Sequence, residues 1–167
     1  MKIQRSFAIW FGSILLSLVL LSSYMTAKEK DKGAKYVCSE TNPQSTCDAS
    51  TTCGSASEPC TIEVKRTANA AAVKPSIPDA KENKPFCIRV GTTVTWKSGS
   101  KDTGFILDFG PNSPFDQQAI IGGTDRSVSV VAKKPGCYKY SAGACTPGTI
   151  YGMCSETSTE IIVTSGN

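Results

Sequence analysis

The sequence predicts an all-β domain, a Greek-key β-sandwich or barrel, with a disulfide-stapled N-terminal extension. Three observations lead to this prediction. After residue 60, seven short segments alternate between apolar and polar residues or are rich in valine and isoleucine, and glycine, proline and asparagine separate them. No segment shows a long helical repeat. The chain also contains eight cysteines, an even number that suits a disulfide framework.

Residues 1–27 have the layout of a signal peptide. Lys2 and Arg5 form a basic start, an uncharged run follows, and Ala27 offers a small residue at the expected cleavage point. The alternative is an uncleaved membrane anchor, because the run is long enough to span a bilayer. Several lysines follow the run, which opposes export under the positive-inside rule. The cysteines favour export, so we expect a secreted or periplasmic protein of the cell envelope.

All eight cysteines lie after residue 27. An even count in a small exported chain predicts disulfides, although the spacing does not choose among the many possible pairings. Zinc is the rival interpretation, but the gaps contain no C-x2-C pair and the chain has no histidine. The cysteines expected in disulfides are Cys38, Cys47, Cys53, Cys60, Cys87, Cys137, Cys145 and Cys154.

The chain after residue 27 divides into two parts by composition. Residues 28–59 are polar and cysteine-rich, so they cannot bury enough apolar surface to order themselves. We expect a lysine-rich leader followed by a flap that disulfides pin to the main domain. A recognition loop is the alternative for this extension. Residues 60–167 carry the β-pattern and form the predicted β-domain.

The strand prediction rests on alternation. The seven expected strands are 61–66, 86–90, 93–97, 105–109, 127–132, 137–140 and 160–164. Between the first two, residues 68–73 are expected to form a loop or one helical turn, because Pro75 and Pro78 follow. Gly122 and Gly123 are expected at a hairpin turn.

Five short pieces follow one another along the predicted β-domain. They are FCIRVGTTVTWKS from residue 86, FILDF from residue 105, PGCYKY from residue 135, CTPGTIYGM from residue 145 and IIV from residue 161. In this order they resemble the strands and the ligand loop of plastocyanin-type cupredoxins. The resemblance covers roughly residues 60–165 and implies a cupredoxin-like Greek-key fold. An immunoglobulin-like sandwich is the alternative.

The resemblance also implies a copper site, whose histidines this chain lacks. The family's loop pattern is C-x-P-H-x-x-x-G-M, and here Gly148 stands at the histidine position. Phe105 stands where the family has its first histidine. Cys145 follows Tyr138 by seven residues instead of the family's four, so either three residues are inserted or Ala142 holds the ligand position. Type-1 copper needs two imidazoles, and the chain contains no histidine.

We therefore predict a copper-free binding or structural domain, with no cofactor and no enzymatic activity. Its expected partner is an unspecified protein or small molecule, and membrane contact is expected only through an uncleaved N-terminus. The net charge is only +4 and no basic cluster carries interleaved aromatics, so nucleic acid is not an expected partner. Phe115 is a candidate for contact with a partner, and the alternative is that its ring plugs one end of the barrel. The residues predicted for the binding surface are Phe105, Phe115, Cys145, Pro147, Tyr151 and Met153.

Two other functions stay open at the level of sequence. Cys145 and Met153 could bind Cu(I) as soft ligands, provided that Cys145 does not pair with the nearby Cys154. A small secreted hydrolase would instead use paired carboxylates. The candidates for that role are Asp102, Asp108, Asp116 and Asp125.

The intact mass of the unreduced, secreted protein tests the disulfide prediction. We expect all eight cysteines to be oxidised, so the mass should lack eight hydrogens and no thiol should react with an alkylating reagent. The same spectrum reports whether residues 1–27 have been removed. Alkylation of Cys145 in the unreduced protein would contradict the prediction and favour the Cu(I) alternative.

Overall fold

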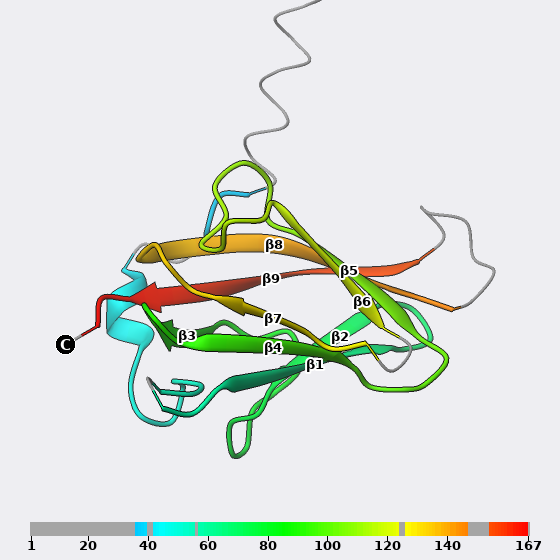
Figure 1. Ribbon diagram of the computed structural model, residues 1–167, viewed down its shortest axis with the longest axis horizontal. Helices are drawn as coiled ribbons and strands as arrows, with labels where there is room; N and C mark the ends of the chain where they lie inside the picture. Colours follow the sequence, from blue (N-terminus) through cyan, green and yellow to red (C-terminus); the bar gives the residue numbers. More distant parts are fainter. Residues whose placement is uncertain (1–35, 40–41, 56, 124–125, 147–153, 167) are drawn as a thin grey trace, which may run out of the picture. The chain divides into compact units, whose positions relative to one another are not determined.

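A computed structural model describes residues 36–39, 42–55, 57–123, 126–146 and 154–166. Within them the strands form two packed sheets, which confirms the predicted all-β sandwich (Figure 1). Residues Tyr36–Asn167 make up one compact unit. The predicted signal peptide lies outside the described residues, and no helix within them is long and apolar enough to cross a membrane.

The strands and their order in the sheets are as follows. The elements are η1 (Pro43–Thr46), β1 (Cys60–Arg66), β2 (Ala71–Pro75), β3 (Phe86–Arg89), β4 (Thr93–Ser98), β5 (Gly104–Asp108), β6 (Ala119–Gly123), β7 (Val128–Val131), β8 (Gly136–Cys145) and β9 (Ser155–Thr164). One sheet has the order β2-β1-β4-β7 and the other has the order β3-β9-β8-β5-β6. The β1–β4 and β3–β9 pairs are parallel and the other pairs are antiparallel.

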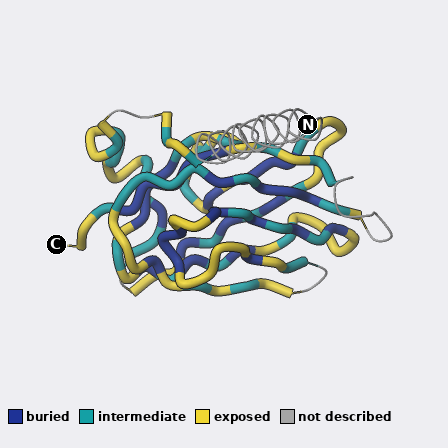
Figure 2. Tube along the Cα trace, turned by 90° about the horizontal axis from the view of Figure 1, so that it is seen from above, coloured by how far each residue is buried: buried dark blue, intermediate teal, exposed yellow. Residues whose placement is uncertain are grey.

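The core lies between the two sheets, where the alternating apolar residues meet. Buried and partly exposed residues alternate along β1, as the sequence predicts, and Ile62 and Val64 face inward. Figure 2 shows buried and more exposed segments alternating along the Cα trace. Four aromatic rings form the centre. Phe109 stacks on Tyr140 with ring centroids 4.5 Å apart, and Trp96 meets Tyr140 edge-on at 5.8 Å. Phe115 packs edge-on against Phe109 with ring centroids 5.2 Å apart.

This aromatic centre contains two unpaired polar groups. The Tyr140 hydroxyl and the Trp96 indole N–H find no hydrogen-bond partner among the described residues. Burial raises the pKa of the Tyr140 phenol far above its usual range, so the ring stays neutral. Both groups therefore reduce the stability that burial of their rings provides.

The structure corrects several predicted elements. Residues 71–75 form β2 instead of a loop or helical turn, because the run from Ala71 to Val73 pairs with β1 and Pro75 ends an edge strand. Gly122 belongs to β6 and not to a turn. A Cβ at this position would lie 2.5 Å from the Phe105 ring, so glycine is needed for close packing. Strands β8 and β9 are each longer than predicted.

The described part of the extension crosses the outer face of the five-stranded sheet. We call residues 36–39 and 42–53 the strap. Its first residue, Tyr36, donates a hydrogen bond of 2.7 Å to Asp108 at the end of β5. A disulfide then links Cys38 to Cys137 on β8. The contacts thus follow the sheet from β5 to its neighbour β8.

The second half of the strap reaches the opposite edge of the sheet. Cys47 forms a disulfide with Cys87 on β3, the edge strand. The Cys53 amide donates to the Cys87 carbonyl at 2.8 Å, and the Cys87 amide donates to the Thr51 carbonyl at 2.9 Å. These bonds satisfy part of the otherwise open β3 edge. The Cys53–Cys60 disulfide finally connects the strap to β1.

The pairing predicts unequal contributions of the disulfides to stability. The Cys38–Cys137 bridge spans 99 residues and the Cys145–Cys154 bridge spans 9. Replacing both cysteines of the first bridge by serine should lower the free energy of unfolding by about 4–5 kcal/mol, against about 2–3 kcal/mol for the second bridge. Urea denaturation of the two double variants measures the difference. Equal losses would contradict the assigned pairing or the loop-closure argument.

Candidate binding pocket

The structure separates the residues of the predicted binding surface. Phe105 and Phe115 are each only 2% exposed, so neither ring is available to a partner. Phe105 pairs in register with Ala144 near the end of β8. Phe115 follows Pro114, whose carbonyl accepts from the Lys133 amide just before β8 begins. The two rings therefore lie toward opposite ends of the sandwich, and the structure does not bring them together on one surface.

The proposed Cu(I) ligand Cys145 is also engaged. It forms a disulfide with Cys154, and no cysteine in the chain has a free thiol. A disulfide sulfur is not a thiolate and cannot serve as a soft metal ligand, so the Cu(I) alternative fails for the oxidised protein. The other predicted loop residues, Pro147, Tyr151 and Met153, lie outside the described residues.

The positions that the sequence resemblance assigns to copper-binding histidines carry no imidazole. A type-1 site needs two imidazole nitrogens and a thiolate. Phe105, at the position of the first histidine, has its ring in the core, and the chain contains no histidine. The remaining position, Gly148, has no side-chain donor.

The carboxylates considered for a hydrolase do not form a paired site. Asp108 accepts hydrogen bonds from the Tyr36 hydroxyl and from the Gly110 amide, so its oxygens hold the strap and the chain turn after β5. Asp116 forms an exposed ion pair with Lys133, and Asp102 is exposed in a turn. Asp125 lies outside the described residues. The described carboxylates of this set are therefore in separate structural settings.

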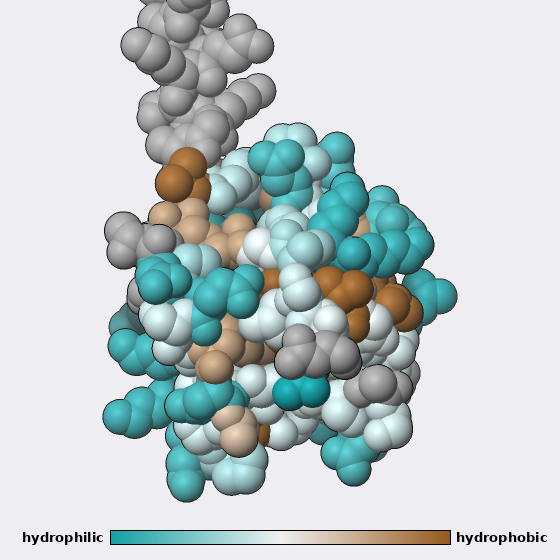
Figure 3. Space-filling view, turned by 90° about the vertical axis from the view of Figure 1, so that its left-hand side faces the viewer, coloured by the Kyte–Doolittle hydropathy of each residue, from teal (hydrophilic) through white to brown (hydrophobic). Residues whose placement is uncertain are grey.

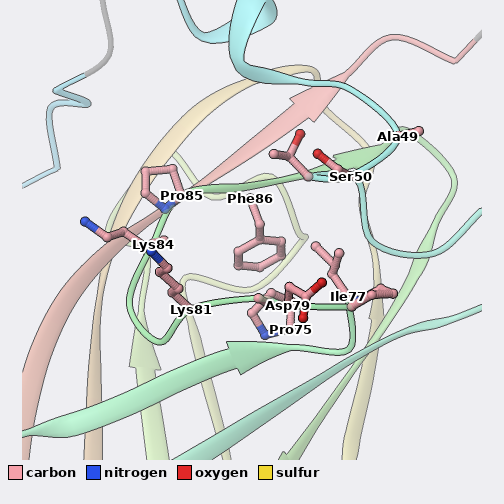
Figure 4. A pocket seen from close by; sticks show the side chains of 12 residues that line it. Ala49, Ser50, Pro75, Ile77, Asp79, Lys81, Lys84, Pro85 and Phe86 are labelled. Atoms are coloured by element: carbon pink, nitrogen blue, oxygen red, sulfur yellow. The ribbon is translucent and has the colours of Figure 1, made fainter.

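The structure instead contains a pocket that sequence reasoning missed. It lies between the strap, the end of β2 and the β2–β3 loop, and its volume is about 680 Å³. Figure 4 shows the Phe86 ring at its centre, with strap residues on one side and the loop on the other. The lining residues are Ala49, Ser50, Thr51, Pro75, Ile77, Pro78, Asp79, Ala80, Lys81, Lys84, Pro85 and Phe86.

The floor of this pocket is apolar and rigid. Phe86 is only 2% exposed and Pro75 is also buried, so both are fixed by the packing beneath them. Pro78 and Pro85 stand at the walls, where the proline rings restrict the backbone. The pocket therefore exists before any ligand arrives, which reduces the entropy lost on binding.

Asn83 anchors the β2–β3 loop that forms one wall. Its side-chain oxygen accepts from the Val73 amide at 2.8 Å, and its side-chain nitrogen donates to the Ala71 carbonyl at 3.1 Å. Its backbone amide donates to the Val73 carbonyl at 2.9 Å. Asn83 thus takes the place of a neighbouring strand at the edge of β2. Its φ of 58° lies in the left-handed region, which asparagine adopts more readily than most residues.

The rim carries the charge of the pocket. Lys81 and Lys84 are exposed and lie close to each other in the loop, whereas Asp79 is the one acidic residue among the lining residues. Figure 4 shows both lysines on the same side of Phe86. Ser50 and Thr51 add hydroxyl groups from the strap. The arrangement can bind an apolar body and attract an anionic group, and none of the lining side chains is a histidine or thiol nucleophile.

A weak signal for this pocket exists in the sequence. Three prolines, at 75, 78 and 85, surround a short stretch that contains Lys81 and Lys84. The proline content of this stretch predicts a rigid connection. The wall that the strap contributes could not be predicted, since it depends on the strap lying over β3.

Comparisons with known proteins show a likeness of fold only. No protein-family model and no curated protein matches the sequence. Among solved structures, a reduced Cu(I) form of an amicyanin variant matches 78% of this chain and 99% of its own, with 11% identity and a TM-score of 0.36. Variant rusticyanin matches 71% of this chain and 84% of its own, with 15% identity and a TM-score of 0.39. At these scores and identities the likeness to cupredoxins gives no information about a site or a function.

Replacing Asn83 tests whether it holds the pocket wall. Asn83→Ala should lower the free energy of unfolding by about 2 kcal/mol, because two side-chain hydrogen bonds are lost and alanine disfavours positive φ. Asn83→Gly should be less damaging by up to about 1 kcal/mol, since glycine adopts this φ freely. Urea denaturation measures both, with the exposed Asn112→Ala as the control. If Asn83→Ala is as stable as the control, Asn83 does not anchor the loop.

Proposed function

We propose that this protein is an extracytoplasmic, copper-free binding domain that takes a small apolar ligand with an anionic group. The observation that carries the proposal is the apolar pocket of about 680 Å³ with two lysines on its rim. Its volume falls within the range of about 300–1,000 Å³ that is usual for small-molecule sites.

The compartment follows from the disulfides. Four bridges engage all eight cysteines, and such a set indicates an oxidising environment outside the cytoplasm. Secretion or periplasmic location, with residues 1–27 as signal peptide, is our proposal within that range. On the end that Figure 3 shows, apolar side chains form separate areas among hydrophilic and near-neutral ones.

The class of ligand follows from the lining. The accessible apolar residues of the lining, Ile77, Pro78 and Pro85, favour an aliphatic or aromatic body. Two lysine ammonium groups against one aspartate favour a carboxylate or similar anion at the mouth. We propose binding and not catalysis, since the chain offers no histidine as a general base or acid.

Titration with decanoate, an aliphatic carboxylate, tests this proposal. We expect the protein to bind decanoate. The double variant Lys81→Ala with Lys84→Ala should weaken this binding about tenfold, since each of the two lost ion pairs contributes up to about 1 kcal/mol. Binding of decanol, which has no charge, should not change in this double variant. Isothermal titration calorimetry measures both ligands.

Two further variants complete the test. Lys101→Ala removes an exposed lysine outside this pocket and should leave decanoate binding unchanged. Ala80→Trp fills the pocket from its wall and should abolish binding of both ligands. Absence of decanoate binding to the unmodified protein, or unchanged binding by Ala80→Trp, would contradict the assignment of the pocket.

A further inference from the structure

A buried carboxylate lies directly beside the disulfide that fixes the start of the strap. Glu160 on β9 is only 4% exposed although its side chain points to the outer face of the sheet, away from the core. The Ser39 amide donates to its Oε1 at 2.7 Å, and the Ser39 hydroxyl donates to the same oxygen. The other oxygen, Oε2, is buried and has no hydrogen-bond partner among the described residues.

The neighbours of this carboxylate are two sulfur atoms. Cys38 Sγ, Cys137 Sγ and a Glu160 oxygen all lie within 4.8 Å of one another. Cys137 and Glu160 stand on the adjacent strands β8 and β9, which fix their positions. Cys38 stands on the strap, so its sulfur can move more freely when the disulfide opens. In the oxidised protein the sulfurs bind each other, and a disulfide of this kind needs no carboxylate beside it.

From this arrangement we infer that the reduced Cys38–Cys137 pair and Glu160 form a zinc-binding site. The disulfide in the oxidised protein and the zinc site in the reduced protein would each attach the strap to the sheet. This inference does not depend on the ligand pocket, which lies at the β2–β3 edge and shares none of these three residues.

The donor set favours zinc over other metals. Zinc accepts thiolates and carboxylates together in a tetrahedral arrangement, with a solvent molecule able to fill a fourth position. Its ligand atoms lie roughly 3.6–3.8 Å apart, so three donors already within 4.8 Å need only small movements. Calcium and magnesium prefer oxygen donors alone, and Cu(I) prefers soft donors without the carboxylate.

The charges of such a site balance. Two thiolates and one carboxylate carry three negative charges, of which Zn²⁺ neutralises two. Lys139 lies opposite Glu160 in the register of β8 and β9 and so presents its ammonium on the same face of the sheet. The salt bridges among the described residues do not include Lys139, and its positive charge would offset the remaining negative charge of the metal site.

Conversion of the disulfide into the zinc site requires thiol–disulfide exchange followed by metal binding. A dithiol reductant transfers two electrons and two protons to the Cys38–Cys137 bond, which gives two cysteine thiols and leaves the reductant as its own disulfide. Zinc binding then displaces both thiol protons to solvent, so affinity should rise with pH. The metal holds the strap on β8 and β9 where the S–S bond held it before.

The test uses the whole chain after residue 27, reduced with a dithiol under anaerobic conditions and then freed of reductant. Zinc binding is measured by competition with a chromogenic chelator. Thiol alkylation with peptide mapping shows which cysteines the metal protects. We expect one zinc ion per chain and protection of Cys38 and Cys137 only. Cys38→Ser with Cys137→Ser should remove this binding.

Glu160→Gln tests whether the Glu160 carboxylate binds the metal together with the two thiols. It keeps the size of the side chain and an oxygen for Ser39, but it removes the charge, so the Kd for zinc should rise at least about tenfold. Glu156→Gln is the matched control, because Glu156 is an exposed residue on the same face of β9. It should leave the Kd unchanged.

Three outcomes would overturn the inference. In the first, the reduced protein binds no zinc. In the second, Glu160→Gln binds zinc as tightly as Glu156→Gln does, which would mean that the thiols act alone. In the third, circular dichroism shows that reduction unfolds the chain and zinc does not restore the fold, so that no site exists in the reduced state.

Discussion

The structure depends on covering the outer face of the five-stranded sheet. Ile162 and Cys87 on this face are fully buried, yet neither belongs to the core between the sheets. A two-layer sandwich by itself would leave this face in water, so burial of these residues requires a further covering layer. The strap provides a third layer over β8, β9 and β3. Without it, the sandwich would expose part of its apolar surface.

The strap cannot hold this position by its own burial. It is polar, and none of the residues of its short 3-10 turn Pro43–Thr46 is buried. Disulfides to β8 and β3 instead limit the freedom of the unfolded chain. Hydrogen bonds to Asp108 and Glu160 then orient the first residues of the strap on the sheet. Covalent bonds thus replace the apolar contacts that the composition of the strap lacks.

The same arrangement creates the pocket at the sheet edge. Residues 49–51 of the strap form one wall and the β2–β3 loop forms the other, above the Phe86 ring. The first wall lies between two disulfides, Cys47–Cys87 and Cys53–Cys60, so it is held on both sides. The second wall is held by Asn83 and stiffened by proline. A pocket with two fixed walls suits a preformed binding site.

The sequence by itself determined the all-β sandwich, because alternation such as Ile62 and Val64 on β1 is a local pattern that needs one buried face. The cysteine count likewise predicted disulfides, since it reports the chemistry of the compartment. Tertiary structure decided what depends on distant residues meeting. Cys38 meets Cys137 across 99 residues, and Phe105 and Phe115 lie toward opposite ends because β5 and its following loop run along the sandwich. Strand β2 escaped prediction since pairing with β1 outweighs the weak local preference of an alanine-rich run. The pocket and the environment of Glu160 were decided in the same way, because both form only where the strap lies on the sheet.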